Sequence, residues 1–162
     1  MTHGSYVPTI DHTAKTMVCN YLSEEKTERI LVVGCGNSTI GEVMFNAGFQ
    51  SVTCVDWSPE AIMNMQSEHR KNEGMEYFVA DCKCMDMLPN AHYDCVIDKG
   101  RACADQTTTQ LTTTHRPLCD EGCLDAIQCG YRALEDARLM LEEVYRVLRP
   151  GGVFFEITRT LD

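Results

Sequence analysis

Two glycines and one carboxylate form the pattern in this sequence whose residue types and spacing could do chemistry. Gly34 and Gly36 follow the apolar run 30–33, which is typical of a buried strand. Glycines at that point let the backbone approach a ligand closely, and the N–H groups of a following helix can receive it. Asp56 ends the next apolar run, about 20 positions later, where a carboxylate can accept hydrogen bonds from both hydroxyls of a ribose. The pattern predicts a nucleotide-cofactor site.

Each half of this pattern also has a plainer interpretation. The third glycine of the dinucleotide fingerprint is absent, since Thr39 stands in its place. Asp56 taken alone could equally be a helix-capping or surface carboxylate. Because the glycine loop and the acid occur together, binding of a ribose becomes the favoured interpretation.

The sequence around these residues predicts strands that alternate with helices. Thr39 and Glu42 have the spacing of a capping box, so a helix is expected directly after the glycine loop. Ser58 is the expected N-cap of the next helix, with Pro59 at its first position. The expected helices cover 11–22, 40–47, 59–72 and, after a start near 124, 134–148; the expected strands cover 30–33, 51–55, 75–80, 93–97 and 153–157.

This order of elements indicates an α/β fold built on a parallel sheet. Successive right-handed strand–helix–strand units cover both faces of such a sheet with helices. The ligand then lies beyond the carboxyl ends of the strands. Four residues occupy that end of four different expected strands, namely Gly34, Asp56, Asp81 and Asp98. Their convergence favours one site at a single edge of the sheet.

Four segments of the chain resemble the class I S-adenosylmethionine-dependent methyltransferases. They are Val-Val-Gly-Cys-Gly-Asn-Ser, Val-Asp-Trp-Ser, Val-Ile-Asp-Lys-Gly and Leu-Arg-Pro-Gly-Gly. The Gly-Cys-Gly-Asn-Ser and Asp-Lys-Gly pieces are most similar to the protein lysine methyltransferases that modify translation elongation factor 1-alpha. The resemblance covers about residues 28–158. It implies a Rossmann-like doubly wound sheet of the class I methyltransferase type in one domain, 1–162, with five parallel strands present and the C-terminal antiparallel strand pair missing.

The resemblance also implies which residues meet the cofactor, S-adenosylmethionine. Gly34, Cys35 and Gly36 would line its methionine part, and Asn37 would contact it as well. Asp56 would hold the ribose hydroxyls. These roles place the methionine and ribose of the cofactor across the ends of the first two strands.

Further roles follow from the same resemblance. Trp57 would press on the adenine ring, although it could also be an ordinary core or surface aromatic. Asp81, with the backbone of Cys82, would read the adenine edge, although Asp81 alone could be a helix-capping acid. Asp98 is the expected catalytic residue, which would orient the attacking amine or only hold the cofactor's amino group. Lys99 would border the same place and could equally be a surface cation, so it is given no chemical role.

Residues 101–122 depart from the pattern of the family. Its members run almost directly from Asp-Lys-Gly into Thr-Leu-Asp-Ala, whereas this chain has an intervening segment rich in threonine. Threonine-rich sequence without apolar spacing has little surface to bury, so a flexible insertion is expected. The aromatic-rich segment that these relatives carry before the first strand is not recognisable in residues 1–28. Cofactor binding should survive these departures better than substrate binding.

Composition narrows the classes of partner. The net charge of −10, from 24 acidic and 14 basic side chains, disfavours a nucleic-acid-binding surface and is compatible with a basic protein partner. No apolar run is long enough for a membrane span, and no secretion signal is recognised. Ten cysteines occur, several inside apolar runs, which favours a reducing, cytoplasmic setting. The pairs Cys82/Cys84 and Cys119/Cys123 lack a second motif with zinc-site spacing, so no metal is expected.

These features together predict a methyltransferase that acts on a lysine of a cytosolic protein, such as elongation factor 1-alpha, and releases S-adenosylhomocysteine. Three alternatives remain open. A nicotinamide-dependent oxidoreductase would share the glycine loop, but no Tyr-x₃-Lys pair is found to donate a proton. The chain could also be a non-catalytic cofactor-binding domain or a methyltransferase of small molecules. The sequence makes no prediction of the oligomeric state.

Overall fold

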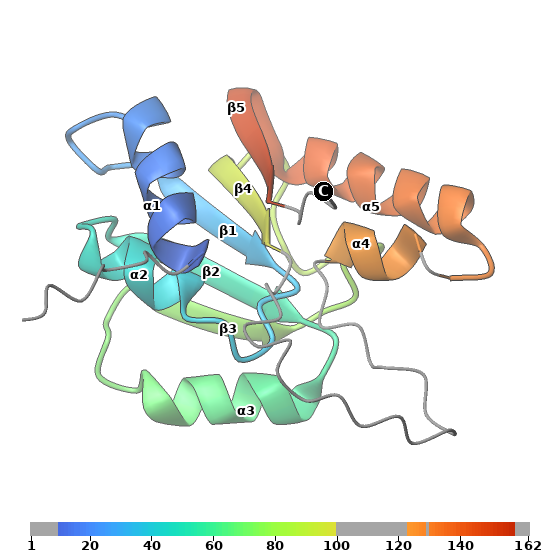
Figure 1. Cartoon of the computed structure of the whole chain (residues 1–162), viewed down its shortest axis with the longest axis horizontal. Helices are drawn as coiled ribbons and strands as arrows, with labels where there is room; N and C mark the ends of the chain where they lie inside the picture. Colours follow the sequence, from blue (N-terminus) through green and yellow to red (C-terminus); the bar gives the residue numbers. More distant parts are fainter. Residues whose placement is uncertain (1–9, 100–122, 129, 158–162) are drawn as a thin grey trace, which may run out of the picture.

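A single parallel sheet organises the part of the chain that the computed structural model describes, residues 10–99, 123–128 and 130–157. Five strands lie in the order β3-β2-β1-β4-β5, and every neighbouring pair is parallel (Figure 1). The strands are β1 Arg29–Val33, β2 Ser51–Asp56, β3 Met75–Val79, β4 Tyr93–Lys99 and β5 Leu148–Ile157. The helices are α1 Ile10–Tyr21, α2 Ile40–Asn46, α3 Pro59–Glu68, α4 Cys123–Gln128 and α5 Ala133–Val147. The expected Rossmann-like α/β architecture is confirmed.

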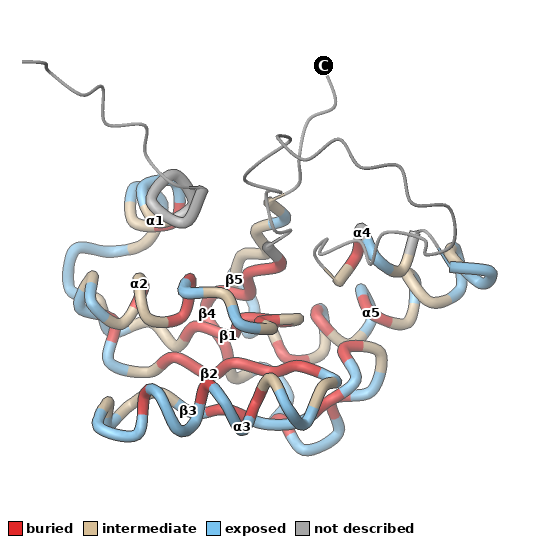
Figure 2. The backbone as a smooth tube through the Cα atoms, turned by 60° about the horizontal axis from the view of Figure 1, so that its bottom comes forward, coloured by how far each residue is buried: buried red, intermediate tan, exposed pale blue. Residues whose placement is uncertain are grey.

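Helices cover both faces of the sheet. On one face, α1, α2 and α3 pack against Ile30 and Val32 of β1. On the other face, α4 and α5 pack against Leu31 and Val33 of the same strand. Figure 2 shows buried residues running along the strands, with the helices arranged around them. Because side chains alternate between the faces of a strand, the continuous apolar run of β1 supplies both cores.

The two predicted helix caps have different outcomes. Ser58 caps α3 as expected, since its Oγ accepts a hydrogen bond of 3.3 Å from the N–H of Ala61. The capping box at Thr39 is wrong, because the Thr39 side chain makes no capping bond. The backbone of Thr39, with φ −81° and ψ 1°, is already close to helical, whereas a capping side chain needs extended backbone at that position. The Oγ of Ser38 instead accepts from the N–H of Ile40 at 3.3 Å.

Helix α2 lies close to β2 because Gly41 faces that strand. A Cβ atom at position 41 would lie 2.6 Å from Sγ of Cys54, which is too short for a real contact. Both residues are buried. Glycine inside a helix costs about 1 kcal/mol relative to alanine, so its place here is explained by this close packing.

Two boundaries differ from the expected ones. Helix α3 ends at Glu68 and not near 72. Strand β5 begins directly after α5, at Leu148, and not near 153. Leu148 has extended backbone angles and pairs with Tyr93 of β4, so strand pairing starts before the Pro-Gly-Gly turn residues.

Some predictions lie beyond the described residues. The expected insertion, 101–122, is among them. Within the described residues, the only antiparallel backbone pairing is an isolated bridge between Asp81 and Cys84. None of the described helices combines the length and the apolar character that crossing a membrane requires.

Candidate cofactor-binding site

The glycine loop after β1 has the backbone that only glycine adopts readily. Gly34 has φ +62° and Gly36 has φ +47°. The loop is fixed to the sheet because the N–H of Cys35 donates to the carbonyl of Val55 at 3.0 Å, and Ser38 N–H donates to the Cys35 carbonyl at 2.8 Å. The Cys35 side chain is buried in the core, so Cys35 can meet a ligand only through its backbone. Asn37 is exposed at the outer turn of the loop.

Asp56 joins the glycine loop to the start of α3. One carboxylate oxygen accepts from the N–H of Gly36 at 2.8 Å, and the other accepts from the N–H of Ser58 at 2.8 Å. Asp56 is 7% exposed, so these bonds are sheltered from water. The glycine loop and the acid, which were paired on sequence spacing alone, therefore meet in space. The interpretation of Asp56 as an ordinary surface carboxylate is wrong.

Trp57 and Asp81 extend this edge of the sheet toward β3. Trp57 is 78% exposed directly after Asp56, which excludes a core role for its ring. Asp81 follows β3 and is also exposed, and its Oδ1 accepts from the N–H of Lys83 at 2.9 Å. Because no helix starts here, Asp81 caps a turn and not a helix. Cys82, the next residue, is buried.

Asp98 holds the beginning of α4. It is 1% exposed at the carboxyl end of β4, opposite Val33 in the sheet. Its two oxygens accept from the N–H groups of Cys123 and Leu124, each at 2.8 Å. A carboxylate at this position satisfies N–H groups that a helix leaves unpaired at its start. The residue expected to be catalytic thus also has a structural role.

Cys123 reaches the glycine loop and was missed as a site residue. A Cβ atom at Gly34 would lie 2.5 Å from Sγ of Cys123, so the thiol lies directly over the first glycine. In the sequence, Cys123 offered only a weak metal-type spacing with Cys119. Its contact depends on the long-range pairing of α4 with Asp98, which no local pattern encodes.

Two buried thiols, those of Cys123 and Cys54, have raised pKa values. A hydrogen bond with Cys82, together with burial, raises the pKa of Cys123 well above its ordinary value. A hydrogen bond with Cys35 and burial likewise raise the pKa of Cys54. A thiol with a raised pKa is a poor nucleophile at neutral pH. Within the described residues, no group of three or more metal-type side chains occurs.

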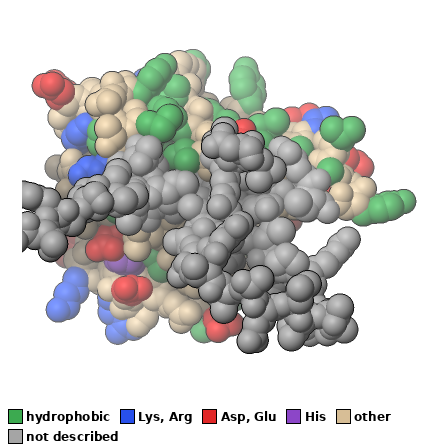
Figure 3. All heavy atoms as spheres, in the orientation of Figure 1, with side chains coloured by type: hydrophobic (Ala, Val, Ile, Leu, Met, Phe, Trp, Pro, Cys, Tyr) green, Lys and Arg blue, Asp and Glu red, His purple; other side chains and the backbone are tan. Residues whose placement is uncertain are grey.

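Two hollows of the described surface lie away from these residues. One, of about 570 Å³, lies along the exposed side of α5, beside Leu134, Leu141 and Tyr145. Another, of about 310 Å³, lies between α3 and β3. Figure 3 shows hydrophobic side chains at the surface toward the α5 end of the molecule. The first hollow is lined by one helix alone, so it is an open face and not a cleft that encloses a small ligand.

The residues present fit a nucleoside cofactor best at its adenosine end. Position 36 has space beside it, since the nearest atom to a Cβ there would be Oδ2 of Asp56 at 4.0 Å. Trp57 and Asp81 offer an exposed ring and an exposed carboxylate on the same edge. At the methionine end, Gly34 and Asp98 already contact α4.

Comparisons with known proteins agree with this fold. The family described as a methyltransferase domain matches residues 24–159. EEF1A lysine methyltransferase 4 of Mus musculus is 31% identical over 131 residues, which are 81% of this chain and 46% of that protein. The eEF1A lysine and N-terminal methyltransferase of Bos taurus is 30% identical over 132 residues, 81% of this chain and 16% of that protein. The chain thus spans less than half the length of these curated relatives.

Solved structures share the fold at lower identity. The S-adenosylmethionine dependent methyltransferase from Mesorhizobium loti is 19% identical, with a TM-score of 0.59, over 91% of this chain and 52% of that one. The trans-methyltransferase CalH, solved in complex with SAH, is 18% identical, with a TM-score of 0.58, over 90% of this chain and 35% of that one.

The fold and the edge of the sheet define a class I, Rossmann-like methyltransferase domain. The chain belongs to the methyltransferase family whose pattern spans residues 24–159. This membership confirms the predicted family and its cofactor class, S-adenosylmethionine, and it removes the nicotinamide-dependent oxidoreductase from consideration.

Proposed function

We propose that this chain transfers a methyl group from S-adenosylmethionine to the side-chain amine of a lysine in a protein, with elongation factor 1-alpha as the first candidate. The observation that carries the proposal is the 31% identity, over 81% of the chain, with a protein named as an EEF1A lysine methyltransferase. The net charge of −10 supports a basic protein as partner and gives no support to nucleic acid. The proposal places the protein in the cytoplasm, away from membranes.

The proposed cofactor site follows the edge of the sheet. The backbone of Gly34, Cys35, Gly36 and Asn37 would hold the methionine part, and the carboxylate of Asp56 would accept from the ribose hydroxyls. Trp57 would cover the adenine ring. Asp81 and the Cys82 backbone would meet the adenine edge, where a carboxylate can accept from the exocyclic amine. The exposure of Trp57 and Asp81 supports these roles.

Bound S-adenosylmethionine would supply an electrophilic methyl group on a positively charged sulfonium. The attacking lysine, with an ordinary pKa of about 10.4, must be neutral, so the site has to favour loss of its proton. Asp98 is the proposed catalytic residue, because its carboxylate is buried at the carboxyl end of β4. Its bonds to the start of α4 fix the carboxylate at this end of the strand, where it would orient the amine.

Labelling tests this function directly. The purified chain and isotopically labelled S-adenosylmethionine would be incubated with elongation factor 1-alpha and, separately, with cell extract. Mass spectrometry then locates the label, with Asp56→Ala as the control that should lose transfer. Label on a lysine is the expected result, whereas label confined to small molecules would overturn the protein substrate.

A second candidate is a domain that binds the cofactor without transferring a methyl group. It is favoured by the contacts that Gly34 and Asp98 already make with α4. Measurable binding of S-adenosylhomocysteine, with no label transferred to any acceptor, would support this candidate.

A further inference from the structure

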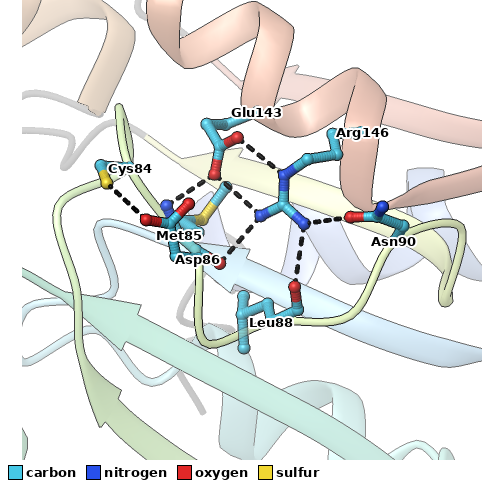
Figure 4. A network of polar contacts seen from close by, with 7 residues as sticks. All are labelled: Cys84, Met85, Asp86, Leu88, Asn90, Glu143 and Arg146. Atoms are coloured by element: carbon cyan, nitrogen blue, oxygen red, sulfur yellow. Dashed lines mark hydrogen bonds and ion pairs between the residues drawn. The ribbon is translucent and has the colours of Figure 1, made fainter.

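The loop between β3 and β4, residues 80–92, carries two of the proposed adenosine-binding residues, Asp81 and Cys82. It contains no helix, and its own backbone pairing is limited to an isolated bridge between Asp81 and Cys84 and to turn hydrogen bonds from Cys84 to Asp81 and from Leu88 to Met85, each at 2.8 Å. Figure 4 shows that side chains from α5 point into this loop. We call this segment the β3–β4 loop.

Arg146 of α5 supplies hydrogen bonds to three points of the β3–β4 loop. One guanidinium nitrogen donates to the carbonyl of Met85 at 2.8 Å. The other terminal nitrogen donates to the carbonyl of Leu88 at 2.9 Å and to Oδ1 of Asn90 at 2.6 Å (Figure 4). Because a guanidinium is planar and presents its donors in a fixed fork, these bonds set the spacing of the carbonyls.

Glu143, one turn earlier on α5, completes the contact. Its Oε2 accepts from the N–H of Met85 at 2.6 Å, and both of its oxygens pair with Arg146, at 2.7 and 2.8 Å. The two side chains are 15% and 26% exposed, so the pair is largely sheltered. Both the N–H and the carbonyl of Met85 are therefore held by α5.

Further contacts join the same helix to both ends of the loop. Near the end of the loop, Ala91 and His92 donate to the backbone carbonyls of Arg146 and Val147, each at 2.8 Å. Near its beginning, Nζ of Lys83 lies 3.8 Å from Asp81 and 3.6 Å from Asp136 of α5. The carboxylate proposed to read adenine is thus connected to α5 through one lysine.

Apolar contacts hold the loop independently of the guanidinium. The buried side chains of Cys82, Met85 and Leu88 belong to the same core cluster as Met140 and Val144 of α5. Loss of the Arg146 head group should therefore leave the loop attached to the core and free its backbone to shift.

We propose that Arg146, together with Glu143, is a positioning residue for the adenosine end of the cofactor site. It contacts no part of the proposed site itself; it fixes the β3–β4 loop so that Asp81 and the Cys82 backbone face the adenine edge. This inference rests on the proposed cofactor site and not on the identity of the methyl acceptor.

Discrimination between two ligands tests the role of Arg146. Calorimetry would compare S-adenosylhomocysteine with S-inosylhomocysteine, in which the exocyclic amine of adenine is replaced by a carbonyl oxygen. The wild-type chain should prefer the adenosine compound, by about tenfold for one well-placed hydrogen bond. Asp81→Ala and Arg146→Gln should each lose most of this preference, and Arg146→Lys should keep part of it.

Arg138→Gln is the matched control, since its partner among the described residues is Glu142, on the exposed side of the same helix. It should keep the full preference. A variant that merely unfolds more often would lose affinity for both ligands equally, so an unchanged ratio in Arg146→Gln would overturn the positioning role. If Arg146→Gln does not fold, the ratio of the two affinities is measured in Arg146→Lys, and a ratio equal to that of the wild type would overturn the positioning role.

The remaining outcomes separate this inference from the proposals it rests on. If the wild-type chain binds neither ligand, the proposed cofactor site is overturned. If it binds both ligands with equal affinity, the role of Asp81 is overturned, and the role of Arg146 with it. Failure of methyl transfer to elongation factor 1-alpha would leave the ligand ratio, and this inference, standing.

Discussion

Asp56 has a structural role in the loop and a proposed role in cofactor binding. It ties the glycine loop to α3 through Gly36 and Ser58, and it is the proposed acceptor for the ribose hydroxyls. Asp56→Ala should weaken binding of S-adenosylhomocysteine by about 1.5–3 kcal/mol, the range for a charge-assisted hydrogen bond. Calorimetry measures this loss. Unchanged affinity in a folded variant would show that the ribose is held elsewhere.

Gly34 and Gly36 share positive φ but differ in what surrounds them. Alanine at either position should cost about 1–2 kcal/mol for its left-handed backbone. Gly34→Ala should cost more than Gly36→Ala, because its Cβ would also meet Sγ of Cys123 at 2.5 Å. Urea unfolding measures both costs.

A second substitution isolates the contact with the thiol. Adding Cys123→Ala to Gly34→Ala should recover the part of the free energy of unfolding that comes from the contact and leave the backbone cost in place. If Gly34→Ala and Gly36→Ala lower the free energy of unfolding equally, the contact between position 34 and Cys123 is contradicted.

At the scale of elements, the amino ends of three strands meet at Asp94. This buried carboxylate of β4 accepts from the N–H of Arg29 in β1 at 2.7 Å and pairs with Arg149 in β5. Asp94→Ala should lower the free energy of unfolding by about 1.5–3 kcal/mol. Because Asp94 lies at the opposite end of the strands from Asp98, affinity for S-adenosylhomocysteine should be unchanged. A large loss of affinity would mean that the two ends of the sheet are coupled.

The elements themselves were largely predictable from the sequence, because they depend on local patterns. The β1 run, the helix start at Ser58 and the spacing of Gly34 and Asp56 are all contained in short stretches, and all are found where expected. The capping box at Thr39 failed since the glycine loop imposes a near-helical backbone on that residue.

The contacts that complete the site could not be predicted in the same way. Cys123 meets Gly34, and Arg146 meets Met85, across long stretches of chain. Neither pair has a local signature: an arginine in the last turn of a helix is ordinary, and so is a cysteine at the first position of a helix. Only the order of the strands brings them together.

At the scale of the whole molecule, the Glu143–Arg146 pair should contribute to the dependence of stability on pH. The hydrogen bond from Arg146 lowers the pKa of Glu143 below its ordinary value of 4.5. A lowered pKa in the folded state stabilises the chain above about pH 4.5 and loses this contribution as the pH falls through the lowered value. The destabilisation caused by Arg146→Gln should therefore be larger at pH 7 than at a pH below the lowered pKa of Glu143.

Denaturant titrations at several pH values test this dependence. Arg138→Gln again serves as the comparison, because its exposed pair with Glu142 should contribute little at any pH. If the free energies of unfolding of wild type and Arg146→Gln differ by the same amount across the pH range, the role assigned to the Glu143 carboxylate is contradicted.

The close approach of α2 to β2 limits which pairs of residues positions 41 and 54 can carry during evolution. Position 41 has no room for a methyl group while a sulfur atom stands at position 54. Gly41→Ala should therefore be tolerated only in chains where residue 54 is itself glycine or alanine, so the two positions are expected to vary together among descendants of this fold. A deep collection of natural sequences in which alanine at 41 accompanies cysteine or larger residues at 54 would show that the helix can move away from the sheet.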